Sequence, residues 1–273
     1  MPFVVDDGPG EPRAAQAPPP AGTVAAAATM RSSQIPPMTL HAWLRYDVFR
    51  RLLPTSVRSI LEIGAGKGSV GSLLARRFRY VGLEPDPESF VAAANRIGET
   101  GTIHPLREQE YSSEESFDVV CAFEVLEHIE DDQGALVDWQ RYVKRGGWLF
   151  VSVPAGRDRF GPTDVRQGHF RRYAREDLAR VLTEAGLTEI SVVTYGFPIG
   201  YVLLAGSNVL ARRRPHAPTL SERTGASGRW MQPSASRAAL MRVSAAPFQL
   251  LQRPFGRTSL GTGLVARARV PAA

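Results

Sequence analysis

Residues 60–69 read ILEIGAGKGS, and this run constrains the fold of the chain more than any other. An apolar stretch passes directly into three glycines, Gly64, Gly66 and Gly68, and a helix-forming stretch follows at once. Glycine is required where a side chain would block a tight turn or hold a ligand away from the backbone. The run therefore predicts a buried strand, a turn that admits a ligand to the backbone, and a helix.

Short β-rich runs alternate with helical stretches along the chain. The predicted strands are 59–63, 80–83, 102–104, 118–123 and 148–153, with helices at 69–79, 87–97 and 134–144 between them. A helix at 39–53, capped by Thr39 and ended by Pro54, precedes them, and a helix at 175–185, a strand at 189–194 and a last edge strand at 263–270 follow. This alternation predicts an α/β fold with a doubly wound, mostly parallel sheet that is covered on both faces.

Composition divides the chain into three parts. Residues 1–37 are rich in Pro and Ala and predict a disordered leader, 38–200 form the ligand-binding domain, and 201–273 form a basic extension. Within the extension, 212–236 is expected to be a flexible Arg-rich insertion. The apolar segment 195–211 favours a lid helix over a substrate, packed against a second apolar run at 245–251. The alternatives are a dimer contact and peripheral membrane contact through 195–214.

The net charge of +6 is unevenly distributed. From Gly206 onward there are eleven arginines and one acid, Glu222, whereas the remainder has 22 basic and 26 acidic residues. Phospholipid headgroups, nucleic acid or a phosphorylated substrate could meet this basic part, although a solvated arginine-rich loop is the expectation. Cys121 is the single cysteine, which excludes an intrachain disulfide. Because neither a secretion signal nor a bilayer-spanning run is visible, we expect a cytoplasmic protein, with membrane-peripheral location as the alternative.

The glycine spacing and two acidic residues bear on the kind of ligand. The spacing is Gly-x-Gly-x-Gly and not the Gly-x-Gly-x-x-Gly that fits a pyrophosphate. Glu62 puts a carboxylate beside the turn, which suits a cationic ligand and would repel a diphosphate. Glu84 ends the next strand, where a carboxylate can accept both ribose hydroxyls, as it also does in NAD sites. The pattern favours a cationic nucleoside over a dinucleotide.

Residues 59–198 resemble the class I S-adenosylmethionine-dependent methyltransferases, which have a Rossmann-like sheet. The resemblance rests on the glycine motif, Glu84, and the runs FDVVCAF at 117–123 and VKRGGWLFVSVP at 143–154. It implies S-adenosyl-L-methionine as cofactor. The implied cofactor contacts are Glu62, Gly64, Ala65, Gly66, Gly68, Glu84, Pro85, Gln109 and Phe123. For the adenine, Glu108, Gln109 and Glu110 are competing candidates, and a doubly wound domain with another nucleotide ligand is the alternative for the whole set.

The run after the fourth strand carries candidate catalytic residues. On a helical turn, Glu124, Glu127 and His128 would share one face and could hold a hard divalent cation such as Mg²⁺. The same residues resemble the Glu-x-x-Glu-His metal site of plant small-RNA 2′-O-methyltransferases and ubiquinone-pathway O-methyltransferases. In the small-RNA enzymes a later histidine completes the site, and His169 is the matching candidate here. Alternatively, His128 acts as a lone general base, the glutamates favour a helix N-terminus, and His169 anchors its own loop.

Together these features predict an O-methyltransferase that acts on a small hydroxylated molecule such as a sugar, a quinone-like compound or a natural product. The alternatives are N- or C-methylation, a nicotinamide-dependent oxidoreductase, and a non-catalytic module that binds the cofactor. Arg171 and Arg172 are candidates for contact with an anionic acceptor, although solvent exposure is the expectation for each. Nucleic acid is disfavoured as a partner because no aromatic and basic RNA-binding platform is present. The oligomeric state is not indicated.

Overall fold

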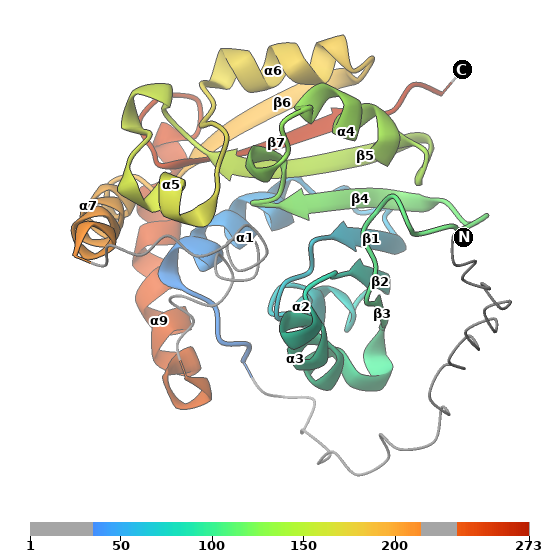
Figure 1. Cartoon of the computed structure of the whole chain (residues 1–273), viewed down its shortest axis with the longest axis horizontal. Coiled ribbons are helices and arrows are strands. Elements are labelled where there is room, and N and C mark those ends of the chain that lie inside the picture. Colours follow the sequence, from blue (N-terminus) through green and yellow to red (C-terminus); the bar gives the residue numbers. More distant parts are fainter. Residues whose placement is uncertain (1–34, 214–233, 273) are drawn as a thin grey trace, which may run out of the picture. The chain divides into compact units, whose positions relative to one another are not determined.

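A computed structural model describes residues 35–213 and 234–272 (Figure 1). The predicted leader, apart from its last three residues, and most of the predicted Arg-rich insertion lie outside these ranges. The described residues belong to one compact unit.

Seven strands form one sheet in the order β3-β2-β1-β4-β5-β7-β6 (Figure 1). Their bounds are β1 Ser59–Ile63, β2 Arg79–Leu83, β3 Thr102–His104, β4 Phe117–Phe123, β5 Val143–Pro154, β6 Thr188–Tyr195 and β7 Gly263–Arg269. The five strands from β3 to β5 pair in parallel, and β7 pairs antiparallel with both β5 and β6. The predicted doubly wound, mostly parallel sheet is confirmed.

The last strand is present as predicted but is not at an edge. β7 lies between β5 and β6, with Val151 paired to Ala266 on one side and Val192 paired to Ala266 on the other. Ala266 is fully buried. The prediction of an edge strand was wrong because alternating apolar residues indicate a strand but not its neighbours, which here come from distant parts of the chain.

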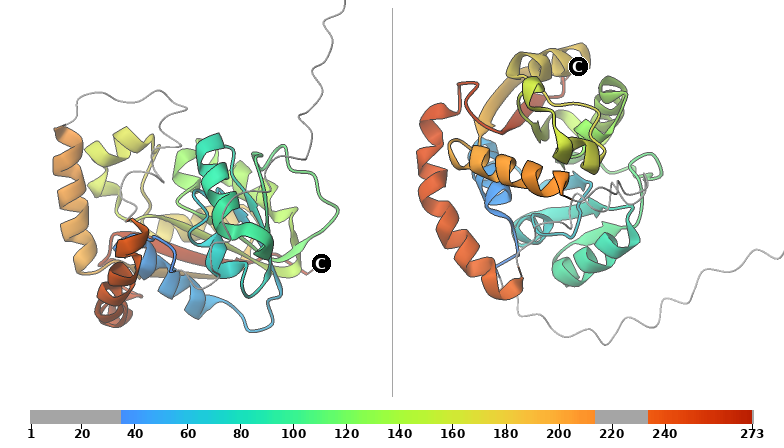
Figure 2. Two further views of the ribbon diagram at one scale, coloured as in Figure 1. Left: turned by 90° about the horizontal axis from the view of Figure 1, so that it is seen from below. Right: turned by 60° about the vertical axis from the view of Figure 1, so that its left-hand side comes forward.

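Helices cover both faces of the sheet (Figures 1 and 2). They are α1 Leu40–Leu52, α2 Gly71–Leu74, α3 Pro87–Ile97, α4 Asp132–Gln140, α5 Pro162–Gln167, α6 Arg175–Glu184, α7 Ile199–Arg212 and α9 Ala235–Leu251. Leu136 and Trp139 of α4 and Leu178 of α6 pack on one face. On the other face, Phe49 of α1 meets the rings of Phe123 and Phe150 edge to face, with centroids 5.1 and 5.0 Å apart.

Most helix boundaries follow local signals. The Thr39 hydroxyl accepts a hydrogen bond from the Ala42 amide at 3.1 Å, which caps α1 as predicted, and the helix ends before Pro54. The helix predicted at 69–79 is much shorter, since the turn after β1 continues to Val70 and β2 begins at Arg79.

The C-terminal helices lie at the end of the sheet toward which β4 and β5 point (Figure 1). α7 contacts α5, whereas α9 packs chiefly against α1. The run at 245–251, for which the sequence predicted contact with 195–211, therefore has α1 as its main partner. Among the described residues, no helix combines the length and the apolar character needed to cross a membrane.

Candidate functional site

The strand order reverses between β1 and β4, and the candidate site lies at the carboxyl ends of these two strands. Open α/β sheets bind ligands at such switch points. Gly64, Gly66 and Gly68 follow β1 with φ values of 69°, 55° and 70°, so all three adopt the left-handed conformation that favours glycine.

The three glycines have different surroundings. A Cβ on Gly64 would lie 2.6 Å from Cγ2 of Val125, and one on Gly68 would lie 2.9 Å from both Cα and Cβ of Ala93 in α3. A Cβ on Gly66 would meet no protein atom within 4 Å. Gly64 and Gly68 therefore permit close packing, whereas the open space is at Gly66.

Glu84 lies beside Gly66 and is buried. Its Oε2 accepts a hydrogen bond from the Gly66 amide at 2.6 Å, and its Oε1 accepts one from the Asp86 amide at 2.9 Å. Each carboxylate oxygen keeps a second lone pair. The turn thus combines an open backbone with a fixed carboxylate, which fits a ribose as the sequence predicts.

Glu62 is placed differently from Glu84. It is buried within the turn, where its Oε2 accepts a hydrogen bond from the Tyr80 hydroxyl at 2.6 Å. Burial raises the pKa of Glu62 to about 7, although Tyr80 and Arg45 oppose the shift. Glu62 therefore supports the turn through Tyr80, and its predicted cofactor contact remains a prediction.

The other predicted cofactor residues surround the same strand ends. Ala65 is buried and its amide donates to the Leu83 carbonyl at 2.9 Å, Phe123 is buried at the end of β4, and Pro85 is exposed. Gln109 is also exposed, and its Nε2 donates to Oε1 of Glu108 at 2.8 Å. The choice among the three adenine candidates stays open.

Glu124 does not share a helical face with Glu127 and His128. It has a φ of 57° and precedes a short 3-10 helix at Leu126–His128, so the predicted helical turn through Glu124 was wrong. The Glu124 carboxylate lies 3.3 Å from Nη1 of Arg45. It also accepts hydrogen bonds from Ser152 at 2.9 Å and Tyr195 at 3.2 Å. Arg45 and these hydroxyls all engage Oε1 of Glu124, and the pKa of Glu124 is lowered chiefly by Arg45 against the effect of burial.

Glu127, His128 and His169 form a compact cluster. One ligand atom from each lies within 4.8 Å of those of the other two. Both carboxylate oxygens of Glu127 and Nε2 of His128 are buried without a hydrogen-bond partner, and Nε2 of His169 is 3.9 Å from Oε1 of Glu127. Burial raises the pKa of Glu127 well above its usual range and lowers that of His128 to about 4.

The second nitrogen of each imidazole is fixed from behind. Nδ1 of His169 is 2.8 Å from Oδ1 of the fully buried Asp164, and His128 has a hydrogen bond to the backbone of Gly168. Such bonds orient imidazoles that bind metal ions. Three unpartnered donor atoms with both rings fixed in this way fit a divalent cation.

The loop before α6 is held by the same carboxylate. Nε of Arg172 donates to Oδ1 of Asp164 at 2.9 Å, and Arg172 is buried. The expectation of solvent exposure for Arg172 was wrong because Asp164 neutralises its charge inside the protein. Arg171 is partly exposed and pairs with Asp132 at 2.8 Å.

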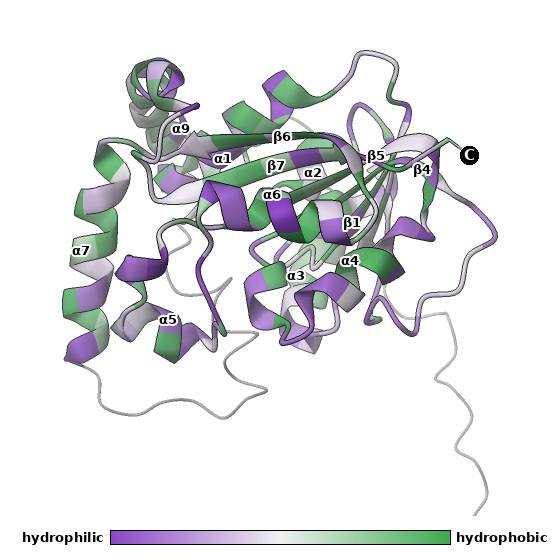
Figure 3. Cartoon of the chain, turned by 90° about the horizontal axis from the view of Figure 1, so that it is seen from above, coloured by the Kyte–Doolittle hydropathy of each residue, from purple (hydrophilic) through white to green (hydrophobic). Residues whose placement is uncertain are grey.

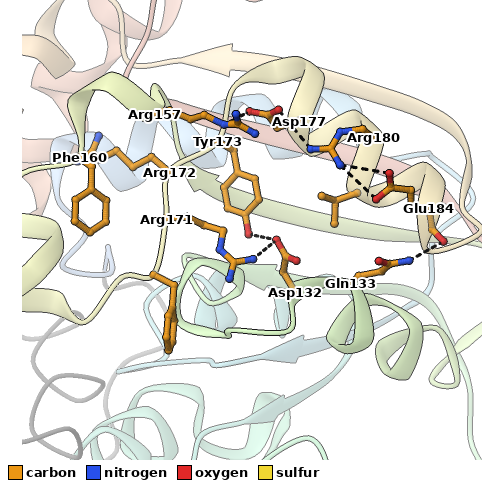
Figure 4. Close-up of a pocket in the computed structure, with 12 residues that line it drawn as sticks. Asp132, Gln133, Arg157, Phe160, Arg171, Arg172, Tyr173, Asp177, Arg180 and Glu184 are labelled. Carbon is orange, nitrogen blue, oxygen red and sulfur yellow. Dashed lines mark hydrogen bonds and ion pairs between the residues drawn. The ribbon is translucent and has the colours of Figure 1, made fainter.

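A cavity of about 570 Å³ lies on the other side of this loop, between α4 and α6 (Figure 4). Arg157, Arg171 and Arg180 line it together with acidic partners, and Phe170 forms part of its wall. The Phe170 amide donates to the Glu127 carbonyl at 2.8 Å, so the cavity adjoins the cluster through one loop.

Three residues near the site were not found from the sequence. Arg45 lies in α1, Tyr195 ends β6, and Asp164 lies in the first turn of α5. Arg45 and Tyr195 are far from Glu124 in the sequence, so no local pattern indicates that they contact it. Asp164 could have been found, since an acidic residue a few positions before a histidine can hydrogen-bond to the imidazole ring of that histidine.

Comparison with known proteins gives a family assignment. A family model described as a methyltransferase domain matches residues 40–192. A probable S-adenosylmethionine-dependent methyltransferase of Mycobacterium tuberculosis is 27% identical over 157 residues, which cover 55% of this chain and 57% of that protein. A ubiquinone biosynthesis O-methyltransferase of Paracidovorax citrulli is 32% identical over 120 residues, covering 40% and 49%. The chain thus spans about half the length of the curated relatives it matches.

The solved structures support the fold. The crystal structure of a putative methyltransferase from Bacillus halodurans superimposes with a TM-score of 0.53 at 16% identity, covering 84% of this chain and 98% of the other. By its matching domain and fold, the chain belongs to the class I S-adenosylmethionine-dependent methyltransferase family.

Proposed function

We propose that this protein transfers the methyl group of S-adenosylmethionine to a hydroxyl oxygen of a small molecule. The observation that carries the proposal is the cluster of Glu127, His128 and His169, whose possible ligand atoms converge after β4. Those of Glu127 and His128 are buried without a hydrogen-bond partner. The glycine turn follows the adjacent strand β1. A donor site and an acceptor site are thus expected side by side.

The cofactor would be held by the turn after β1. Gly66 offers open space, and Glu84 offers lone pairs to ribose hydroxyls. S-adenosylmethionine supplies an electrophilic methyl group: the acceptor oxygen bonds to the methyl carbon, the carbon–sulfur bond breaks, and S-adenosylhomocysteine leaves. The acceptor hydroxyl must lose its proton in this reaction.

A divalent cation held by Glu127, His128 and His169 fits the donor set. Two imidazole nitrogens and one carboxylate suit manganese, iron, cobalt or zinc better than Mg²⁺, which prefers oxygen ligands. When bound, such an ion lowers the pKa of an acceptor hydroxyl. Asp164 and Gly168 keep Nε2 of each histidine free. Glu124 is left out of this ligand set because the converging ligand atoms come from the other three residues. Its Oε1 is already bonded to Arg45, Ser152 and Tyr195.

A lone general base is the weaker explanation of His128. With a pKa of about 4, its ring is neutral near pH 7 but is a poor proton acceptor for a hydroxyl. The same neutrality leaves Nε2 available as a ligand atom. Oxygen as the accepting atom is supported further by the relatives that are ubiquinone biosynthesis O-methyltransferases.

Metal binding tests the cluster separately from catalysis. The EDTA-treated protein is titrated calorimetrically with Mn²⁺, Zn²⁺ and Mg²⁺, and affinity for S-adenosylhomocysteine is measured in parallel. We expect one equivalent of Mn²⁺ or Zn²⁺ to bind, and His169→Ala to weaken this at least tenfold without changing the affinity for S-adenosylhomocysteine. Thr183→Ala, on the exposed side of α6, is the control. If His169→Ala binds the metal as tightly as the unchanged protein does, the cluster is not the metal site.

The acceptor atom is tested with matched substrates. Methyl transfer from radiolabelled S-adenosylmethionine is followed with pairs of aromatic acceptors that differ only in carrying hydroxyl or amino groups. We expect label on the hydroxyl compounds. Label on the amines alone would show N-methylation and overturn the proposal of O-methylation. Failure to bind S-adenosylhomocysteine would overturn the proposed methyltransferase activity itself.

A further inference from the structure

Helix α7 directs two polar side chains toward the protein, while some of its apolar side chains face solvent. Asn208 accepts a hydrogen bond from the Thr163 amide of α5 at 3.2 Å, and Ser207 bonds the Thr163 hydroxyl at 3.3 Å. On the outer side, Val202 is 66% exposed and Val209 is 52% exposed. They lie seven residues apart, which puts them on one face of the helix.

Helix α9 packs Ala245, Met241 and Phe248 against the core, but its outer side also carries exposed apolar residues. Nε2 of Gln249 donates to the Trp43 carbonyl of α1 at 3.0 Å. Leu240, Val243 and Leu250 are each more than 60% exposed, and their spacing of three and seven residues puts them on one stripe. Helices that pack on a soluble core normally bury such side chains.

Figures 2 and 3 show α7 and α9 at the same end of the molecule, and green, hydrophobic segments recur along α7. We call the exposed apolar residues of these two helices the outer stripes. Exposed apolar stripes on two surface helices at one end of the molecule indicate a binding surface.

Positive charge surrounds the outer stripes. Arg212 and Arg213 end α7, Arg237 and Arg242 lie in α9, and Arg253 follows it. Within the described ranges 199–213 and 234–272 there is no aspartate or glutamate. Arg253 lies 3.7 Å from Asp47 of α1, whereas no acidic partner within the described residues is recorded for the first four. A surface that combines apolar stripes with arginines matches the interface of a membrane that contains anionic lipids.

We propose that the outer stripes of α7 and α9, with their arginines, dock this protein on the surface of an anionic lipid bilayer. A second copy of the chain fits less well, because it would bring arginines against arginines without acids between them. Nucleic acid would satisfy the arginines but would leave the valines and leucines exposed. Docking leaves the helices parallel to the membrane surface, and this inference goes beyond methyl transfer.

Vesicle binding tests the surface with the full chain. Sedimentation is measured with vesicles of phosphatidylcholine alone and of equal parts phosphatidylcholine and phosphatidylglycerol. We expect binding to the anionic vesicles that is at least tenfold tighter than to the neutral ones and that weakens with salt. The double variant V202S/V243S should bind at least tenfold more weakly. R212Q/R213Q should lose roughly 25-fold, since each arginine near an anionic surface contributes about fivefold.

Val91→Ser is the matched control, because Val91 is a 56% exposed valine on α3, away from the outer stripes. It should bind vesicles as the unchanged protein does, and circular dichroism should show every variant folded. Absence of binding to anionic vesicles, or full binding by V202S/V243S, would overturn the proposal. So would a dimer in light scattering that V202S/V243S dissociates, since the surface would then belong to a second copy. None of these measurements depends on methyl transfer.

Discussion

Replacing Gly66 by alanine should separate ligand binding from stability in the glycine turn. Gly66 has a φ of 55°, and a Cβ there would meet no protein atom within 4 Å. The stability cost is then the left-handed conformation alone, about 1–2 kcal/mol. The added methyl group would occupy the space beside Glu84 in which the ribose is expected. We therefore expect the dissociation constant for S-adenosylhomocysteine to rise at least tenfold, about 1.4 kcal/mol.

Gly68→Ala should have the opposite balance. Its Cβ would lie 2.9 Å from Cα and Cβ of Ala93, so α3 must move. Overpacking of this kind costs roughly 1–3 kcal/mol in addition to the left-handed conformation, which gives a total of about 2–5 kcal/mol. The larger loss of stability should accompany a smaller direct effect on binding, because the methyl group points into α3.

Gly186→Ala is the control for conformation. Gly186 follows α6 with a φ of 83° and open space around it, far along the chain from the turn. It should lose stability as Gly66→Ala does and should bind the ligand normally. Urea unfolding gives the free energies, and isothermal titration with S-adenosylhomocysteine gives the affinities. The reasoning is refuted if Gly66→Ala keeps normal affinity while Gly68→Ala loses it.

Two further predictions concern titrating carboxyl groups. Burial raises the pKa of Glu62 from 4.5 to about 7, so the folded protein keeps a proton that the unfolded chain releases. The free energy of unfolding should therefore fall by roughly 3 kcal/mol on account of this group as the pH rises from 4.5 to 7. Glu62→Gln should lack this contribution when urea unfolding is measured across the same pH range. Asp118 accepts hydrogen bonds from the Arg58 and Ser59 amides at 2.7 and 2.9 Å and from Lys144 at 2.7 Å, which hold its pKa at about 2. Asp118→Asn should cost about 2 kcal/mol at pH 7, and the difference from the unchanged protein should narrow as the pH falls toward 2; an unchanged difference would show that the carboxylate charge is not involved.

The parallel half of the fold could be predicted because its signals are local. β1 and β3 have the predicted bounds, since Gly64 closes the apolar run of β1 and Gly101 and Pro105 flank β3. α3 also has its predicted bounds, with Asp86 capping its first turn and Gly98 ending it. The position of β7 between β5 and β6 could not be predicted, because antiparallel pairing with two distant strands leaves no trace in the sequence of β7 itself.

The candidate site was predicted in part for the same reason. Glu127 and His128 are adjacent, and their position after a strand indicates the ligand-facing edge of the sheet. Glu124 was grouped with them because helical spacing was assumed, but its left-handed backbone, uncommon for a residue with a side chain, breaks that spacing. Its actual partners, Arg45 and Tyr195, come from α1 and β6 and depend on tertiary packing.

The candidate site and the proposed docking surface are physically connected, although the family match ends at residue 192. Asp164 of α5 fixes the ring of His169, and the neighbouring Thr163 is bonded to Asn208 of α7. The outer side of α7 carries the exposed valines. Only Asp164 and Thr163 therefore lie between the cluster and the helix that bears that surface. Because α7 follows the matched domain in the chain, its own sequence can change while the cofactor turn stays the same. A difference in acceptor between this protein and its relatives is therefore expected to arise from α7 and not from the glycine turn.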